Sequence, residues 1–300
     1  MILAHSFWSI PFRKTLGNYE HLRSAGGWYS QDFFFMSILL SCLKVKSHHD
    51  AIHLVTDTFG KRLLIDRLEL PYSSYNCSLD MIDQIDPSLW AIGKIVTYDL
   101  LNEPFLHLDN DVFLYQALPG ELLQSNLIVQ NFDTDAHYYQ DVFEIATNYL
   151  GELPSFVKQF IEKSKAQNRV YGCNAGIIGG HDLEIFKSLK KLVFSLLKSL
   201  KINAADKNFG LINMFLEQTL FLLLAQKNDA SIIPLFETMD LEFERVLAFE
   251  NIPQAGYIHA VGKAKRAKNT NEQIYLRLLQ EYPDELDRLM FNLKKLRNEV

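Results

Sequence analysis

Asp109 and Asp111 are the residues of this sequence whose type and spacing point most directly to chemistry. They stand two residues apart, directly after the apolar run 105–108, and the apolar pattern resumes at Val112. This pattern indicates a buried strand that ends at the two acids. Ionised carboxylates cannot stay in a dry strand interior without a compensating cation. Because hard divalent cations prefer oxygen ligands, the pair predicts a cation site where the strand emerges, with an anionic ligand beyond the ion.

His259, Gly262 and Lys265 form a second group, spaced three residues apart. An imidazole can complete a transition-metal shell, a glycine lets phosphate oxygens reach backbone N–H groups, and a lysine neutralises phosphate charge. Each residue also has an ordinary interpretation: a structural histidine, and a lysine in the solvated basic run 263–268. The regular spacing of all three favours a binding site for a phosphorylated ligand.

Three further features accompany these groups. Residues 173–180 form a strand of small residues in which Asn174 offers an amide for sugar hydroxyls, or in which the glycines serve only close packing. Lys94 precedes the acidic pair and supplies a second cation for the same ligand. Glu217 and Gln218 interrupt an apolar helix, where they either act at the site or face solvent at the helix edge.

The elements that must position these residues alternate between strands and helices, which predicts an α/β fold with a mostly parallel central sheet. Ligands of such sheets bind beyond the carboxyl ends of the strands, where Asp57, Asp109 and Asp111 fall. Residues 130–139 are polar and aromatic and indicate a loop over the site. Strands are expected at 1–7, 51–55, before Pro71, 105–108 and 170–180. Helices are expected at 29–45, 61–68, 89–101, 141–165 with a break, 183–200, 211–225 and 271–300 with a break at Pro283.

Composition restricts the classes of protein to which the chain can belong. The 300 residues are 48% hydrophobic and 22% charged, as in globular proteins, and the net charge of −6 argues against nucleic-acid binding. Three widely spaced cysteines indicate a reducing compartment without a disulfide framework. We find no cationic leader, and the apolar stretch 211–225 is too short to span a bilayer, so we expect a cytoplasmic protein without a transmembrane segment.

The ordered set of motifs resembles the GT-A glycosyltransferases, and most of all glycosyltransferase family 8. In that family an Asp-x-Asp ends a hydrophobic strand, an Asn-Ala-Gly follows, and a His-x-x-Gly-x-x-Lys closes the catalytic domain. The matches here are Asp109/Asp111, 174–176 and His259/Gly262/Lys265, in the same order. The resemblance implies a GT-A-type α/β/α sandwich over residues 1–265, with a nucleotide-binding half at 1–115 and an acceptor half at 116–265. Residues 266–300 would be a C-terminal helical extension that packs on the sheet or mediates a homodimer.

The resemblance also implies a reaction. Asp109, Asp111 and His259 would hold Mn2+ or Mg2+, and the imidazole favours Mn2+. The metal would bridge the diphosphate of a nucleotide-sugar donor, a UDP-sugar above all. The sugar would pass, with retention of anomeric configuration, to an acceptor that the sequence does not identify, whether a glycan, a lipid-linked molecule or another compound.

The same resemblance assigns further roles by position. Catalytic roles would fall to Asp109, Asp111, Asn174, Glu217 and Gln218, although the family usually has Asp where Glu217 stands. Donor binding would involve Lys94, Gly262 and Lys265 at the diphosphate, Asn174 at the sugar, and Ala4, Ser6 and Asp57 at the uracil and ribose.

Two alternatives to a glycosyltransferase remain. One is a catalytically inactive module that binds nucleotide-sugars or glycans. The other is a phosphotransferase of the haloacid-dehalogenase type, which also carries Asp-x-Asp at a strand end. That class has its motif near the N-terminus, with Thr or Val two residues after the second Asp, where this chain has Phe113. The inactive module is therefore the stronger alternative.

Overall fold

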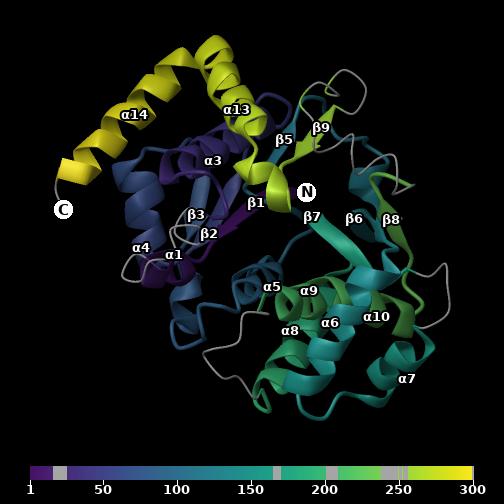
Figure 1. Cartoon of the computed structure of the whole chain (residues 1–300). Coiled ribbons are helices and arrows are strands. Elements are labelled where there is room, and N and C mark those ends of the chain that lie inside the picture. The colour runs from purple at the N-terminus through teal and green to yellow at the C-terminus, as the bar shows by residue number, and fades with distance from the viewer. Residues whose placement is uncertain are drawn as a thin grey trace. The chain divides into compact units, whose positions relative to one another are not determined.

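The computed structural model describes residues 1–15, 26–164, 170–200, 209–237, 249, 252 and 256–298. Over these residues the chain is an α/β protein with a seven-stranded, mostly parallel sheet (Figure 1). The strands are β1 (Ile2–Phe7), β2 (His53–Thr56), β3 (Ser74–Asn76), β4 (Phe105–Leu108), β5 (Val112–Leu114), β6 (Leu127–Asp133), β7 (Gly172–Gly180), β8 (Ile232–Pro234) and β9 (Tyr257–His259). The predicted fold class is confirmed.

The helices of the described residues include two π-helical and three 3-10 segments. The α-helices are α1 (Ser9–Thr15), α3 (Gln31–Lys46), α4 (Thr58–Lys61), α5 (Ala91–Leu100), α6 (Ala136–Tyr149), α7 (Ser155–Lys163), α8 (Leu183–Leu197), α9 (Phe209–Met214), α10 (Leu220–Lys227), α13 (Lys268–Glu281) and α14 (Pro283–Asn298). The π-helical segments are η1 (Arg62–Arg67) and η4 (Phe215–Thr219), and the 3-10 segments are η2 (Ser78–Ile82), η3 (Leu122–Gln124) and η6 (Gly262–Arg266). None of them is long and apolar enough to cross a membrane.

The chain divides into two compact units. The first contains residues 2–87, 108–118 and 240–300, and its strands are ordered β3-β2-β1 with parallel pairing, beside a separate antiparallel pair of β5 and β9. The second contains residues 88–107 and 119–239, with the order β4-β7-β6-β8. In it β6 pairs in parallel with β8 and antiparallel with β7.

Helix α3 is the central helix of the first unit. Its residues 34–45 are buried without a break, so it has no solvent-facing stripe over this length. Helices α13 and α14 pack against it. Lys44 fixes α13 in place, because its ammonium pairs with Glu281 and lies 4.3 Å from the ring centre of Tyr115. The C-terminal helices are therefore part of the first unit.

The small residues of β7 allow close packing in the second unit. A Cβ at Gly179 would lie 2.0 Å from the Phe105 carbonyl oxygen of β4, and one at Gly172 would lie 2.2 Å from the Tyr139 hydroxyl. Neither position tolerates a side chain unless its neighbours move. Gly172 and Gly179 thus serve close packing, and Asn174 is the polar exception on this strand.

Two predicted elements are wrong. The expected loop at 130–139 is the end of β6 and the start of α6, because Gln130 and Asn131 are buried as hydrogen-bonded amides instead of facing solvent. The short strand expected before Pro71 follows it instead, as β3. The three cysteines are free, as their spacing predicts.

Candidate metal centre

A tight turn presents the two aspartates between β4 and β5. The Val112 N–H donates to the Asp109 carbonyl at 3.0 Å, which closes the turn over Asn110 and Asp111. The side chain of Asn110 donates to the Ser6 carbonyl of β1 at 3.1 Å, and the Ser37 hydroxyl of α3 donates to the Asn110 carbonyl at 2.8 Å. The turn is thus held from both sides, so the positions of both carboxylates are fixed by the fold.

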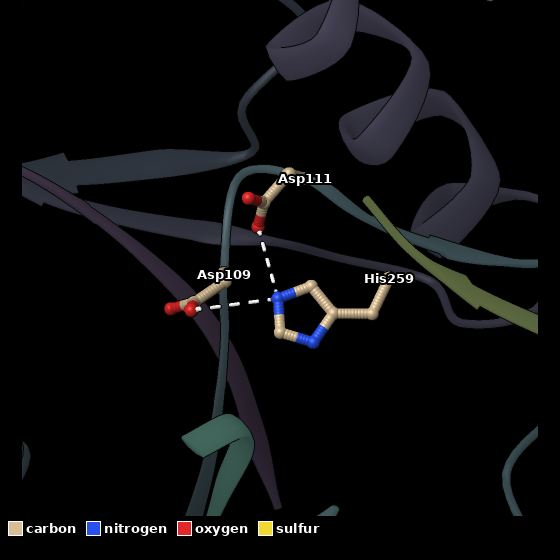
Figure 2. Close-up of side chains that lie close together, drawn as sticks. All are labelled: Asp109, Asp111 and His259. Carbon is tan, nitrogen blue, oxygen red and sulfur yellow. Dashed lines mark ion pairs between the residues drawn. The ribbon is translucent and has the colours of Figure 1, made fainter. Parts of the chain in front are cut away.

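His259 reaches the turn through strand pairing. Val112 of β5 is the direct partner of His259 of β9, and the Ala260 N–H donates to the Asp111 carbonyl at 3.0 Å. The imidazole Nε2 lies 3.5 Å from Asp111 Oδ1 and 3.9 Å from Asp109 Oδ2 (Figure 2). Ligand atoms of the three residues lie within 4.8 Å of one another. Two carboxylates and one imidazole suit a divalent cation of the manganese type, so the residues present fit the expected metal.

Burial makes a positive charge necessary at this centre. The side chains of Asp111 and His259 are only 8% and 4% exposed, and Asp109 is more open at 26%. Burial alone would raise the pKa of Asp111, but the charges of Lys265 and His259 outweigh it and hold that pKa well below its usual range. Asp111 therefore stays ionised in a buried place.

Gly262 and Lys265 lie on η6, which follows β9 directly. Lys265 Nζ lies 2.5 Å from Asp111 Oδ2. Gly262 has a φ of +57°, a conformation that favours glycine, and a Cβ placed there would meet no atom within 4 Å. The backbone at Gly262 is consequently open to a ligand. The structure brings together Asp109, Asp111, His259 and Lys265 at one place.

The residues predicted to line the uracil and ribose have structural partners. The Asp57 carboxylate accepts backbone N–H groups from Ser9 at 2.7 Å and from Gly60 at 2.6 Å, which caps α4 and ties it to α1. Ala4 is buried within β1, and the Ser6 carbonyl accepts the Asn110 side chain. Asp57 thus holds backbone in place, and of these residues Ser6 is the one in contact with the aspartate turn.

Lys94 and Glu217 form a buried ion pair in the second unit. Lys94 Nζ lies 2.7 Å from Glu217 Oε1, and the Tyr98 hydroxyl donates to the same oxygen at 2.5 Å. Glu217 is fully buried on η4, and π-helical turns often occur at functional sites. The interpretation of Glu217 and Gln218 as solvent-facing residues is therefore wrong.

Gln218 belongs to a separate chain of polar contacts in the same unit. The Tyr139 hydroxyl lies 3.2 Å from Gln218 Oε1 and 3.0 Å from Asp133 Oδ2. Asn131 donates to Asp133 at 3.2 Å and is the cross-strand partner of Asn174, whose own Oδ1 accepts the Gly176 N–H at 3.0 Å. Sequence reasoning assigned no role to Tyr98, Asp133 or Tyr139. The amides within the β6 sequence were the available signal, because buried amides in a strand need partners.

Comparison with known proteins gives a family and a set of solved structures, two of which are named below. The model of a family described as a family of unknown function (DUF6734) matches residues 1–291. No curated protein matches the chain. Mouse xyloside xylosyltransferase 1, in its apo form, is 11% identical with a TM-score of 0.40, over 86% of this chain and 96% of its own. The galactosyltransferase LgtC, in complex with donor and acceptor sugar analogs, is 13% identical with a TM-score of 0.45, over 92% and 94%.

Proposed function

The chain belongs to the DUF6734 family, and we propose that it is a metal-dependent glycosyltransferase whose donor is a UDP-sugar. One observation carries the proposal: Asp109, Asp111, His259 and Lys265 come from distant parts of the sequence and converge on one small volume. A structural turn needs no imidazole and no ammonium directed at its two carboxylates. A site that binds a divalent cation together with a diphosphate has a use for both.

We assign metal binding and phosphate binding to residues of the first unit. Asp109 and Asp111 offer carboxylate oxygens, and His259 offers Nε2, from positions fixed by the turn and the β5–β9 pair. The Mn2+ that they would hold supplies Lewis-acid stabilisation of the negative charge on departing UDP. Gly262 leaves its backbone open to phosphate oxygens, and Lys265 brings a positive charge to the same place.

The family 8 resemblance gives sugar-binding roles to polar residues of the second unit. We assign Gln218 and Asn174 to hydroxyl recognition, because amides donate and accept hydrogen bonds as sugar hydroxyls require. Glu217 and Lys94 neutralise each other within hydrogen-bond distance, and the roles that the resemblance gives them, Glu217 at the anomeric carbon and Lys94 at the donor, belong to the proposal. Transfer with retention follows from the family 8 resemblance and belongs to the same proposal.

Release of UDP tests the proposed function. The full chain is incubated with a panel of UDP-sugars, with Mn2+ or with EDTA, and UDP is measured. We expect at least one donor to be hydrolysed or transferred with Mn2+ and none with EDTA. Asp111→Asn should abolish the release, whereas Asp287→Asn, the same change at an exposed position of α14, should preserve it. If no donor yields UDP while Mn2+ and UDP still raise the melting temperature, the chain is a binding module instead.

A further inference from the structure

The two oxygens of the Asp111 carboxylate have different partners. Oδ1 faces the His259 imidazole at 3.5 Å, and Oδ2 lies 2.5 Å from the ammonium of Lys265. The same ammonium lies 3.4 Å from the Gly26 carbonyl, and the lysine stem passes 3.5 Å from where a Cβ of Gly27 would be. Lys265 therefore already has a set of partners, and it directs its charge at a proposed metal ligand.

We propose that Lys265 is an exchangeable counter-ion of the metal centre: it neutralises Asp111 in the metal-free protein and transfers to the donor diphosphate when a divalent cation takes its place. This inference rests on the metal site of the proposed function. It assigns to Lys265 two successive partners, and it makes the metal and the nucleotide depend on each other.

The electrostatics of Asp111 require such a counter-ion. A carboxylate that is 8% exposed needs a nearby positive charge, and the ammonium of Lys265 lies 2.5 Å from its Oδ2. An ammonium at this distance and a divalent cation bound to the same carboxylate would repel each other strongly at low dielectric. Movement of the ammonium relieves this repulsion, and the flexible four-carbon stem of a lysine permits it.

This exchange predicts positive cooperativity between the binding of Mn2+ and the binding of UDP. Mn2+ alone has to displace Lys265 from Asp111, which weakens its binding. When UDP is also present, the displaced ammonium gains the diphosphate as a new partner, so each ligand strengthens the binding of the other by the same factor. Removal of the ammonium should therefore act in opposite directions on the two ligands. A lysine that only binds phosphate would leave the affinity for Mn2+ alone unchanged.

The variant Lys265→Met tests whether loss of the ammonium changes the affinities for Mn2+ and for UDP in opposite directions. Mn2+ binding without nucleotide is followed by the electron paramagnetic resonance signal of free Mn2+, and UDP binding at saturating Mn2+ by calorimetry. We expect Lys265→Met to bind Mn2+ alone about five-fold more tightly and UDP about ten-fold more weakly. Lys263→Met removes the same charge from an exposed position of the same turn and should change neither affinity.

A second readout uses the unmodified chain, so it does not depend on the folding of a variant. Lys265 is labelled with an amine-reactive reagent, and the labelled peptide is quantified. We expect Mn2+ to accelerate labelling by freeing the ammonium, and UDP with Mn2+ to suppress it. If Mn2+ binds the unmodified chain but leaves the labelling rate and the Lys265→Met affinity unchanged, the exchange is wrong and the metal site stands. If the unmodified chain binds no Mn2+, the proposed function and the exchange both fail.

Discussion

Val112 and His259 are directly paired across β5 and β9, although they lie in distant parts of the sequence. This pairing places the His259 imidazole beside the two carboxylates that precede Val112. The three side chains together form the Asp-Asp-His cluster. His259 is buried there, so its position does not depend on a surface loop. The pairing thus explains why the two motifs lie together in the fold.

His259 should contribute more to Mn2+ binding than to Mg2+ binding, since imidazole is a better ligand for the softer ion. We expect His259→Gln to weaken Mn2+ binding at least about 10-fold, by comparison with the effect of changes around metal sites, and to weaken Mg2+ binding less. Calorimetry with each ion measures the difference. His137→Gln, at an exposed histidine, is the control. Equal losses for both ions would remove the imidazole from the ligand set.

His5 should make stability depend on pH. Its Nδ1 lies 3.0 Å from the Tyr72 hydroxyl and its Nε2 lies 3.1 Å from Ser41 Oγ. Because the Ser41 hydroxyl donates to the Val112 carbonyl at 2.6 Å, it accepts from Nε2, so Nδ1 is the acceptor for Tyr72. This neutral tautomer helps to hold β5, and burial lowers the pKa of His5 to about 3.

The direction of this pH dependence follows from the pKa of His5 in the folded chain and in the unfolded chain. The unfolded chain binds a proton near pH 6.5, whereas the folded chain binds it only near pH 3. Stability should therefore be lost as pH falls below 6.5, by up to about 1.4 kcal/mol per pH unit from this group. Urea unfolding at pH 7, 6 and 5 measures it. His5→Gln should be less stable at pH 7 but have a flatter pH profile, and an equally steep profile would contradict the assignment. His137→Gln should keep the steep pH profile of the unmodified chain.

Gly262 should be sensitive to substitution because of its backbone alone. Its φ is +57° and no atom would obstruct a Cβ, so Gly262→Ala strains the conformation without a clash. We expect a loss of stability of about 1 kcal/mol together with weaker UDP binding, because η6 also carries Lys265. Gly120→Ala is the matched control, since its Cβ would also meet no atom within 4 Å and its φ lies outside the left-handed region. Identical melting temperatures and UDP affinities for both variants would disprove the role of this turn.

The Lys94–Glu217 pair should behave as a buried ion pair. Lys94→Met leaves a carboxylate with no exposed surface and should lower the free energy of unfolding by about 3 kcal/mol. The double variant Lys94→Met/Glu217→Gln should recover much of that loss, because the uncompensated charge is gone. Chemical denaturation of the two single variants and the double variant gives the coupling energy. Additive losses would show that the pair does not interact.

Residues with strong local patterns were predictable. The apolar runs at β1, α3 and β4 indicated the elements, and the spacing of Asp109 and Asp111 indicated a cation site, whereas only the family resemblance grouped His259 with them. Partners distant in sequence were not predictable. Nothing near Glu217 indicates Lys94 as its partner, so a polar residue on an apolar helix could equally have faced solvent. The prediction of a loop at 130–139 was wrong for a related reason. The buried amides of β6 depend on hydrogen bonds with partners that the sequence does not reveal.

The most direct measurement is anomalous diffraction from crystals of the full chain grown with Mn2+ and UDP. We expect a manganese peak about 2.0–2.6 Å from oxygens of Asp109 and Asp111 and from His259 Nε2. We also expect that the diphosphate contacts the ion and that Lys265 has left Asp111 for a phosphate oxygen. UDP bound with no manganese at the aspartates, or manganese bound elsewhere, would contradict it.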